Sequence, residues 1–324
     1  MSSGKNSLPE PISGAIPGTI AGHAERSMRL IGHETRVSPG FVPHELSGQP
    51  IPPGTSLLAG DSYVLRTDSG LAFFYRKGEG IVTAHDPDAD LTDESLWLNG
   101  SIYAAVACIN GLMPIHASAV AHGGRVYAFT GPSGAGKSTL IAALAGHGLP
   151  MYCDDTLVLD LSDPEQVFCL PGHKRLKLTP EAIGVTGAAA QEPVGAETGK
   201  FYATPASTSL RAAVPLPLAE LIWLETGDTL AITLLTGGAR IARLGDDHYT
   251  TDMFSRAQNR GIGEIFAIRA RLARQVVMSC LVRPRDLAHF ADSAALAAAY
   301  ITKQPHQQDG EAPANHAQQD TPQL

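Results

Sequence analysis

The sequence predicts an α/β fold that follows a small β-rich N-terminal portion. Between residues 25 and 110, short apolar runs alternate with Gly- and Pro-containing turns, which is typical of short strands. From residue 111 onward, strand-type and helix-type patterns alternate. A glycine-rich segment, Gly131–Thr139, joins one of these strands to a helix. Connections of this kind bind phosphate groups in α/β sheets, so the third observation also locates a candidate site.

Composition sets limits on the function classes. The chain has 324 residues, of which 44% are hydrophobic, and this is enough for a well-packed core. Its formal net charge of −8 argues against a nucleic-acid partner. No apolar run reaches the roughly 18 residues of a membrane helix, so we expect no membrane partner and a cytoplasmic location. The four cysteines form no CxxC pair, which favours a reducing compartment and gives no sign of a zinc site.

Four segments follow from these patterns. Residues 1–24 are rich in Ser, Gly and Pro and are expected to form a flexible leader, and residues 25–110 form the β-rich portion. The main α/β domain is expected over residues 111–302. Residues 303–324 contain almost no apolar side chains and are expected to form a disordered tail.

In the β-rich portion, turn residues separate three short strands, and a helix follows them. The predicted strands are Ser62–Arg66, Leu71–Tyr75 and Gly80–Ala84, and the helix spans Glu94–Asn110 with Thr92 as its N-cap.

The second portion begins with two strands that pair across a His-Gly-Gly turn, and a helix follows the glycine-rich segment. In order, the expected elements are strands Ile115–Ala121 and Arg125–Thr130, helix Lys137–Ala145, strands Leu149–Cys153, Thr156–Leu161, Leu218–Leu224 and Leu230–Leu235, and helices Asp252–Asn259 and Leu287–Ile301.

The glycine-rich segment satisfies the phosphate-loop pattern GxxxxGK[ST] in full. Its residues are Gly131, Pro132, Ser133, Gly134, Ala135, Gly136, Lys137, Ser138 and Thr139. Glycines allow successive backbone N–H groups to converge on phosphate oxygens, and the helix N-terminus adds positive potential. We expect Lys137 to reach the β- and γ-phosphates and the Ser138 hydroxyl to bind Mg²⁺. The predicted cofactors are therefore ATP and Mg²⁺.

An ABC-transporter ATPase carries a similar loop, and the order of motifs argues against it. Such an ATPase needs an LSGGQ-type signature after the loop. The only similar string, at Leu46–Gln49, comes before the loop and is followed by Pro50.

Two adjacent carboxylates follow the next strand. A short crossover should return this strand beside the loop strand, so Asp154 and Asp155 should lie at the same sheet edge as the phosphates. His116 lies on the strand expected to pair with Arg125–Thr130. Taken alone, the aspartates could instead cap a turn and His116 could be a buried structural residue.

This combination resembles the catalytic domain of HPr kinase/phosphorylase over about residues 112–162. The matching elements are the strand around His116, the loop, and Cys153-Asp154-Asp155. The resemblance implies a P-loop kinase domain with a fold akin to phosphoenolpyruvate carboxykinase. It also implies that Asp154 is the base that accepts the serine proton and that His116 is its hydrogen-bonded partner. Lys137 would act on the phosphates, and Asp155 and Ser138 would hold Mg²⁺.

The segment after the double aspartate departs from this family. It carries basic residues where HPr kinases have an acidic, Arg-Gly-containing segment, so a second metal-binding acid is missing there and phosphorylase activity stays open. In an acidic chain this basic run is a candidate anchor for the acceptor. Its residues are His173, Lys174, Arg175 and Lys177.

The resemblance implies that the activity is phosphorylation of a serine hydroxyl. The departures favour HPr-kinase-related proteins encoded beside genes for ribosomally made peptides such as lasso peptides, with a precursor peptide or another protein as the acceptor. An HPr kinase, a kinase for a small metabolite and a non-catalytic ATP sensor are the alternatives. The aspartates and His116 favour catalysis, because a sensor needs no base. Proteins of the HPr kinase family are often oligomeric, so the resemblance also allows a homo-oligomer.

Overall fold

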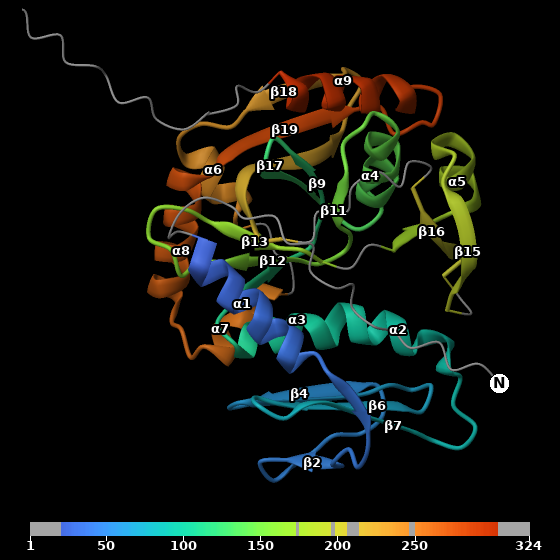
Figure 1. The fold of residues 1–324 in the computed structure, drawn as a ribbon, viewed down its shortest axis with the longest axis vertical. Helices are drawn as coiled ribbons and strands as arrows, with labels where there is room; N and C mark the ends of the chain where they lie inside the picture. Colours follow the sequence, from blue (N-terminus) through green and yellow to red (C-terminus); the bar gives the residue numbers. More distant parts are fainter. Residues whose placement is uncertain (1–20, 173–174, 196–197, 206–213, 246–249, 304–324) are drawn as a thin grey trace, which may run out of the picture.

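A five-stranded sheet forms the N-terminal portion of the computed structural model, which describes residues 21–172, 175–195, 198–205, 214–245 and 250–303 (Figure 1). In spatial order its strands are β1 (Val37–Pro39), β7 (Gly80–His85), β6 (Leu71–Arg76), β5 (Ser62–Arg66) and β4 (Thr55–Ala59). Strand β1 is parallel to β7, and the other neighbours are antiparallel. The three strands predicted here are present, with ends that differ by at most one residue.

The ends of the chain fall largely outside the described residues. The leader predicted for residues 1–24 is described only from residue 21, where helix α1 (Ala21–Glu34) begins. The tail predicted for residues 303–324 is described only at residue 303.

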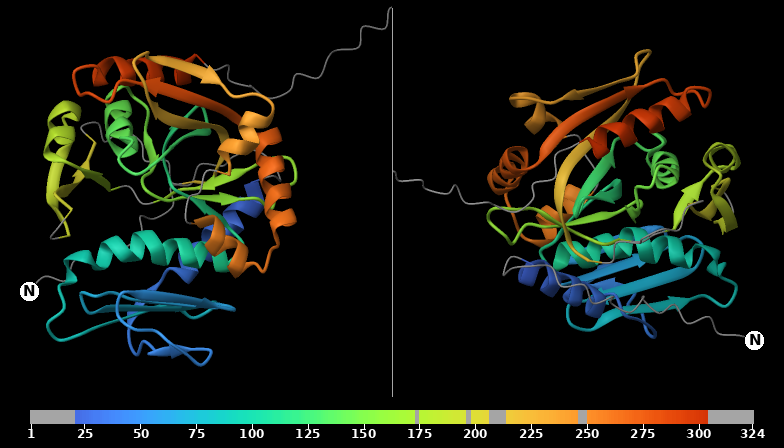
Figure 2. Two further views of the ribbon diagram at one scale, coloured as in Figure 1. Left: turned by 180° about the vertical axis from the view of Figure 1, so that it is seen from behind. Right: turned by 45° about the horizontal axis from the view of Figure 1, so that its top comes forward.

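A helical layer lies between this sheet and the larger part of the molecule (Figures 1 and 2). It consists of α1 and a continuous run formed by η1 (Leu91–Asp93), α2 (Glu94–Trp97), the π-helical turn η2 (Leu98–Ile102) and α3 (Tyr103–Ile109). Ile102 and Val106 pack against Phe73 of β6 and against Val158 from the larger part, so one core spans all three layers. The predicted helix is present, but Asp90 rather than Thr92 is the capping residue, and it accepts a hydrogen bond from the Thr92 amide at 2.9 Å.

The LSGQ string of the sequence forms a hairpin turn. Strands β2 (Glu45–Leu46) and β3 (Gln49–Pro50) are antiparallel, and Ser47 and Gly48 between them have φ angles of 52° and 75°. Positive φ at both central residues is the requirement of a type I′ two-residue hairpin turn.

A nine-stranded mixed sheet organises the larger part. Its main path runs β11 (Met151–Cys153), β9 (Ala117–His122), β10 (Arg125–Thr130), β17 (Leu216–Thr226), β13 (Phe168–Leu170), β12 (Leu157–Asp160) and β8 (Met113–Ile115); β19 (Val277–Arg283) also pairs with β17, and β18 (Ala231–Leu234) pairs with β19. Strands β10, β17 and β19 are mutually parallel along these pairings. Their carboxyl ends therefore lie at one edge of the sheet, where α/β proteins bind ligands.

Helices cover both faces of this sheet. Helices α6 (Gly238–Arg243), α7 (Thr250–Ala257) and α8 (Ile262–Gln275) lie on one face, and α4 (Lys137–Gly146) and α9 (Phe290–Thr302) pack on the other. The side chains of β10 alternate between the two faces of the sheet. Val126 and Ala128 pack in the core with α7 and α8, whereas Tyr127 and Phe129 pack in the core with α4 and α9. The predicted mixed α/β class is confirmed. Among the described residues, none of the helices has the length and apolar character needed to cross a bilayer.

A small three-stranded sheet stands beside α4. Its order is β14 (Leu176–Leu178), β16 (Lys200–Thr204) and β15 (Ala189–Val194), and α5 (Pro180–Thr186) accompanies it. Leu176 and Leu178 are buried in the core that contains α4. Because strand side chains alternate, Lys177 between them points the other way.

Candidate functional site

The glycine-rich loop leaves β10 and enters α4 through left-handed backbone conformations. Gly131, Gly134 and Gly136 have φ angles of 144°, 78° and 83°, and Gly136 is the N-cap of α4. A Cβ atom at Gly136 would lie 2.5 Å from the Nη2 atom of Arg283. Glycine is therefore favoured at Gly136 by the backbone conformation, and an added Cβ would also displace the end of the Arg283 side chain.

Gly136→Ala is expected to destabilise the protein by more than the roughly 1–2 kcal/mol of a left-handed alanine, because the guanidinium of Arg283 must also move. Gly146→Ala is the matched control in the same helix: nothing lies within 4 Å of its added Cβ, and it should be neutral or stabilising. Denaturant unfolding measures both variants. Equal stability of the two would contradict this description of the loop.

Lys137 points back into the loop. Its side chain is 6% exposed, and Nζ donates hydrogen bonds to the carbonyl oxygens of Gly131 at 2.9 Å and Pro132 at 3.1 Å. Burial lowers the pKa of this ammonium, and the charges of Asp154 and Asp155 oppose that effect. A cation held only by carbonyl oxygens at this place can exchange these bonds for bonds to an anion.

Asp154 lies at the end of β11 and is 3% exposed. Its Oδ1 atom accepts hydrogen bonds from the Oγ atoms of Ser138 at 2.9 Å and Ser118 at 2.5 Å. Its buried Oδ2 atom has no hydrogen-bond partner within the described part of the chain. Burial raises the pKa of this carboxyl group, and the hydrogen bond from Ser118 opposes it.

A buried carboxylate oxygen without a hydrogen-bond partner is able to bind a cation. A serine hydroxyl and a carboxylate oxygen are ligands that Mg²⁺ prefers, and Mg²⁺ usually completes its shell with water and phosphate oxygens rather than with further side chains. In the described ranges no group of three or more His, Cys, Asp or Glu side chains could form an all-protein metal site. Ser138 and Asp154 therefore fit a nucleotide-bound Mg²⁺.

Asp154→Asn should make the metal-free protein more stable at neutral pH. A raised pKa means that the folded chain holds the proton more tightly than the unfolded chain, so the native state loses stability as pH rises through the folded pKa. Asparagine keeps an acceptor for both serines but carries no charge. Unfolding free energies measured without Mg²⁺ should differ little near the ordinary pKa of 3.8 and favour the variant by about 1 kcal/mol at neutral pH. A variant that is less stable at neutral pH would contradict this.

Asp155 faces a different set of partners. His116 Nδ1 lies 3.3 Å from its Oδ1 atom and 2.9 Å from its backbone oxygen, and Lys177 Nζ lies 2.7 Å from its Oδ2 atom. Burial disfavours its charge, but the hydrogen bond from His116 and the charge of Lys177 outweigh burial and lower the pKa of Asp155. Asp155 has a φ of 71°, a left-handed conformation that is uncommon outside glycine and found most often in Asn and Asp.

The structure thus brings Lys137, Ser138, both aspartates and His116 to one edge of the sheet. It differs from the sequence analysis in the partner of His116, which is Asp155 where Asp154 was expected. Adjacent strand-end residues point to opposite sides, and the left-handed turn at Asp155 directs its carboxylate toward His116. His116 lies at a bend between β8 and β9, so the single strand predicted over Ile115–Ala121 is broken there.

The basic run does not act as one group. Lys177 contacts Asp155, whereas the guanidinium of Arg175 stacks 3.8 Å from the centre of the Tyr202 ring and pairs with Glu192. His173 and Lys174 lie outside the described residues. Of the described pair, only Lys177 therefore faces the site.

Arg283 is a site residue that the sequence analysis missed. It ends β19, is 8% exposed, and its Nη2 atom donates a hydrogen bond of 2.7 Å to the carbonyl oxygen of Ala135 in the loop. Burial lowers its pKa, and among the described residues it has no carboxylate ion pair. Arg285 also approaches the loop, with Nη2 3.6 Å from the Cβ position of Gly134. An apolar run that ends in Arg-Pro-Arg was the available signal in the sequence.

Comparisons with known proteins find similarity only among solved structures, and that similarity is distant. No protein-family model matches the chain. No curated protein sequence matches it either. Among solved structures it is similar to the Hpr(Ser) kinase/phosphatase from Coxiella burnetii, with 10% sequence identity and a TM-score of 0.31 over 58% of this chain and 88% of that one. The chain thus has a kinase/phosphatase as a distant structural neighbour, and the case for its function depends on its own side chains.

Proposed function

We propose that this chain is an ATP-dependent kinase that transfers the γ-phosphoryl group of ATP to a hydroxyl group. One observation carries the proposal: the hydroxyl of Ser138 hydrogen bonds to buried Asp154, whose second oxygen has no partner among the described residues. A serine that follows the loop lysine, joined to a carboxylate at a strand end, is the arrangement with which P-loop enzymes hold a nucleotide-bound metal.

The loop supplies the phosphate contacts in this proposal. Its left-handed glycines and the first turn of α4 direct N–H groups at the β-phosphate region, and Lys137 moves its hydrogen bonds from the carbonyls of Gly131 and Pro132 to phosphate oxygens. Arg283 supports the loop from behind through Ala135. Ser138 and Asp154 hold Mg²⁺, which, when bound, neutralises charge on the transferred group.

Asp155 is the proposed base, which reverses the division of roles expected from the family resemblance. Its side chain is 32% exposed and can be reached by an acceptor, whereas Asp154 is 3% exposed. The acceptor hydroxyl gives its proton to Asp155 as its oxygen forms a bond to the γ-phosphorus, and the bond from that phosphorus to the bridging oxygen of ADP breaks. His116 and Lys177 orient the carboxylate.

Lys177→Met should move the acidic limb of the pH profile of kcat/KM to higher pH. Lys177 lowers the pKa of Asp155, so its removal raises that pKa and a larger fraction of Asp155 is protonated at a given low pH. The base must be ionised to accept a proton, so activity should begin to fall at a higher pH than in the wild type. A profile measured over the acidic range tests this; an unchanged limb together with reduced kcat would assign the base elsewhere.

The proposed acceptor is a serine hydroxyl on a protein or on a ribosomally made precursor peptide. The chain with ATP and Mg²⁺ should be incubated separately with HPr, with a precursor peptide encoded nearby, and with a panel of small hydroxyl metabolites, and phosphorylation should be measured by mass spectrometry. Phosphate on a serine of the peptide supports the proposal. Phosphorylation of HPr alone, or of a metabolite alone, would identify that molecule as the acceptor instead of the peptide. ATP binding without transfer to any of them, over a range of conditions, would favour an ATP sensor.

A further inference from the structure

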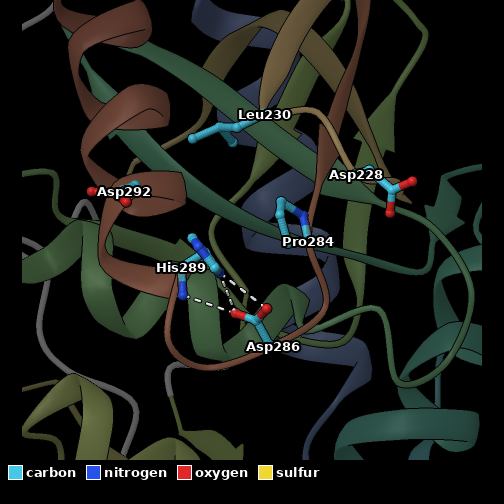
Figure 3. A pocket seen from close by; sticks show the side chains of 6 residues that line it. All are labelled: Asp228, Leu230, Pro284, Asp286, His289 and Asp292. Carbon is cyan, nitrogen blue, oxygen red and sulfur yellow. Dashed lines mark hydrogen bonds and ion pairs between the residues drawn. The ribbon is translucent and has the colours of Figure 1, made fainter.

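A pocket of about 370 Å³ opens beyond the glycine-rich loop, at the carboxyl ends of β17 and β19 (Figure 3). It is lined by Asp228, Leu230, Pro284, Asp286, His289 and Asp292. Three segments supply these residues: the turn between β17 and β18, the connection from β19 to α9, and the first turn of α9. The volume is within the range of small-molecule sites.

The pocket and the loop share one segment of chain. Pro284 lines the pocket, and its two neighbours approach the loop: Arg283 bonds to Ala135, and Arg285 comes close to Gly134. Since β10, β17 and β19 are parallel, the loop after β10 and the pocket beyond β17 and β19 lie at the same edge of the sheet. A ligand in the pocket is therefore a neighbour of anything bound by the loop.

The strand order indicates which end of a nucleotide can reach the pocket. Asp154 and Asp155 follow β11, which lies on the β9 side of β10, whereas the pocket lies on the β17 and β19 side. The γ-phosphate belongs with the metal ligands and the base. The α-phosphate and the nucleoside then extend away from the aspartates, and the acceptor, which must reach Asp155, approaches from the opposite side.

The pocket walls combine apolar side chains with acidic ones. Leu230 and Pro284 offer apolar surface to the face of a base, and carboxylates lie beside them. Asp228 is exposed and has no hydrogen-bond or ion-pair partner within the described residues, whereas Asp286 contacts the amide and ring nitrogen of His289, the residue before α9 (Figure 3). Carboxylates at the carboxyl edge of a parallel sheet accept hydrogen bonds from ribose hydroxyls in other nucleotide-binding proteins.

We propose that this pocket holds the nucleoside of the triphosphate bound at the loop, and that Asp228 and Asp286 accept hydrogen bonds from its ribose hydroxyls. The inference builds on the proposed function and extends it to the choice of nucleotide: a ribonucleoside triphosphate is preferred over its deoxy counterparts, and inorganic triphosphate binds through the loop alone.

Calorimetric titration of the full chain with ATP, 2′-deoxy-ATP, 3′-deoxy-ATP and inorganic triphosphate, each with Mg²⁺, tests this. The variants are Asp228→Ala, which removes no hydrogen bond or ion pair of the described residues, and Asp286→Asn, which keeps an acceptor for the amide of His289. Asp88→Ala, an exposed aspartate of the N-terminal portion, is the control. Wild type and control should bind ATP about tenfold more tightly than at least one deoxy analogue. The site variants should lose that difference and bind inorganic triphosphate unchanged.

Wild-type affinity for ATP in both site variants would overturn the inference. Equal affinity of the wild type for ATP and for inorganic triphosphate would do the same, and would leave the proposed kinase function intact. A loss of inorganic triphosphate binding in the site variants would count against it too, because the effect would then lie in the loop. Failure of the wild type to bind either ligand would remove the proposed function together with this inference.

Discussion

Lys137→Ala should reduce ATP turnover by at least roughly 10²–10³-fold, the usual effect of removing one preorganised electrostatic group. Lys137 is the buried ammonium inside the loop, and its hydrogen bonds go to carbonyl oxygens that an anion can replace. ATP affinity should fall sharply as well, because the loss affects the ground state and the transition state together. Steady-state turnover and equilibrium ATP binding measure the two effects.

Two checks separate this result from a folding defect. Lys77→Ala, an exposed lysine in the turn between β6 and β7, is the matched control and should have wild-type turnover. The Lys137 variant should keep its cooperative unfolding transition, because burial of its ammonium is itself unfavourable. Wild-type turnover and affinity in Lys137→Ala would show that the loop does not bind the phosphates.

Asp155→Asn should lower the rate of phosphoryl transfer by roughly 10²–10⁴-fold, the usual contribution of a general base, and leave ATP·Mg²⁺ binding nearly unchanged. Asparagine keeps the shape and an acceptor for His116 or Lys177, but it cannot accept the proton. Asp154→Asn should instead raise the Mg²⁺ concentration needed for half-maximal binding of ATP, because it removes a metal ligand next to Ser138. Single-turnover transfer and Mg²⁺ titrations measure both variants.

These two variants also decide between the structure-based roles and those implied by the family resemblance. If Asp154→Asn loses transfer with an unchanged Mg²⁺ requirement, and Asp155→Asn raises that requirement, then Asp154 is the base and Asp155 the metal ligand. Wild-type transfer rates in both variants would place the base outside this pair.

The loop and the double aspartate could be predicted because both depend on short stretches of sequence. The GxxxxGK[ST] pattern fixes a strand, a turn and a helix within a few residues, and a crossover of ordinary length returns the next strand to the same sheet edge. The strands of the N-terminal hairpins were predicted for a similar reason, since turn residues separate them at short intervals.

The contacts that determine the roles of Asp154, Asp155 and Arg283 could not be predicted, because they join residues far apart in the sequence or depend on one dihedral angle. Ser118 meets Asp154 across 36 residues, and Arg283 meets Ala135 across 148. Asp155 has a left-handed conformation, which turns its carboxylate toward His116. This conformation cannot be recognised from the sequence of an Asp-Asp pair at the end of a strand.

The basic run shows that charged residues close together in the sequence need not share a surface. A cluster in the sequence suggested a common surface, but the period of a strand separates its members. Lys177 in β14 points away from the buried Leu176 and Leu178 and reaches Asp155, whereas Arg175 before the strand is held by Tyr202 and Glu192.

The most direct test of the central claim, a metal–nucleotide site formed by Lys137, Ser138 and Asp154, is a calorimetric titration of the full chain with ATP in the presence of Mg²⁺ and again with excess EDTA. We expect saturable binding of one ATP per chain that weakens markedly when Mg²⁺ is removed, and a loss of this Mg²⁺ effect in Asp154→Asn. Absence of saturable binding, or ATP binding that is the same with and without Mg²⁺, would contradict it.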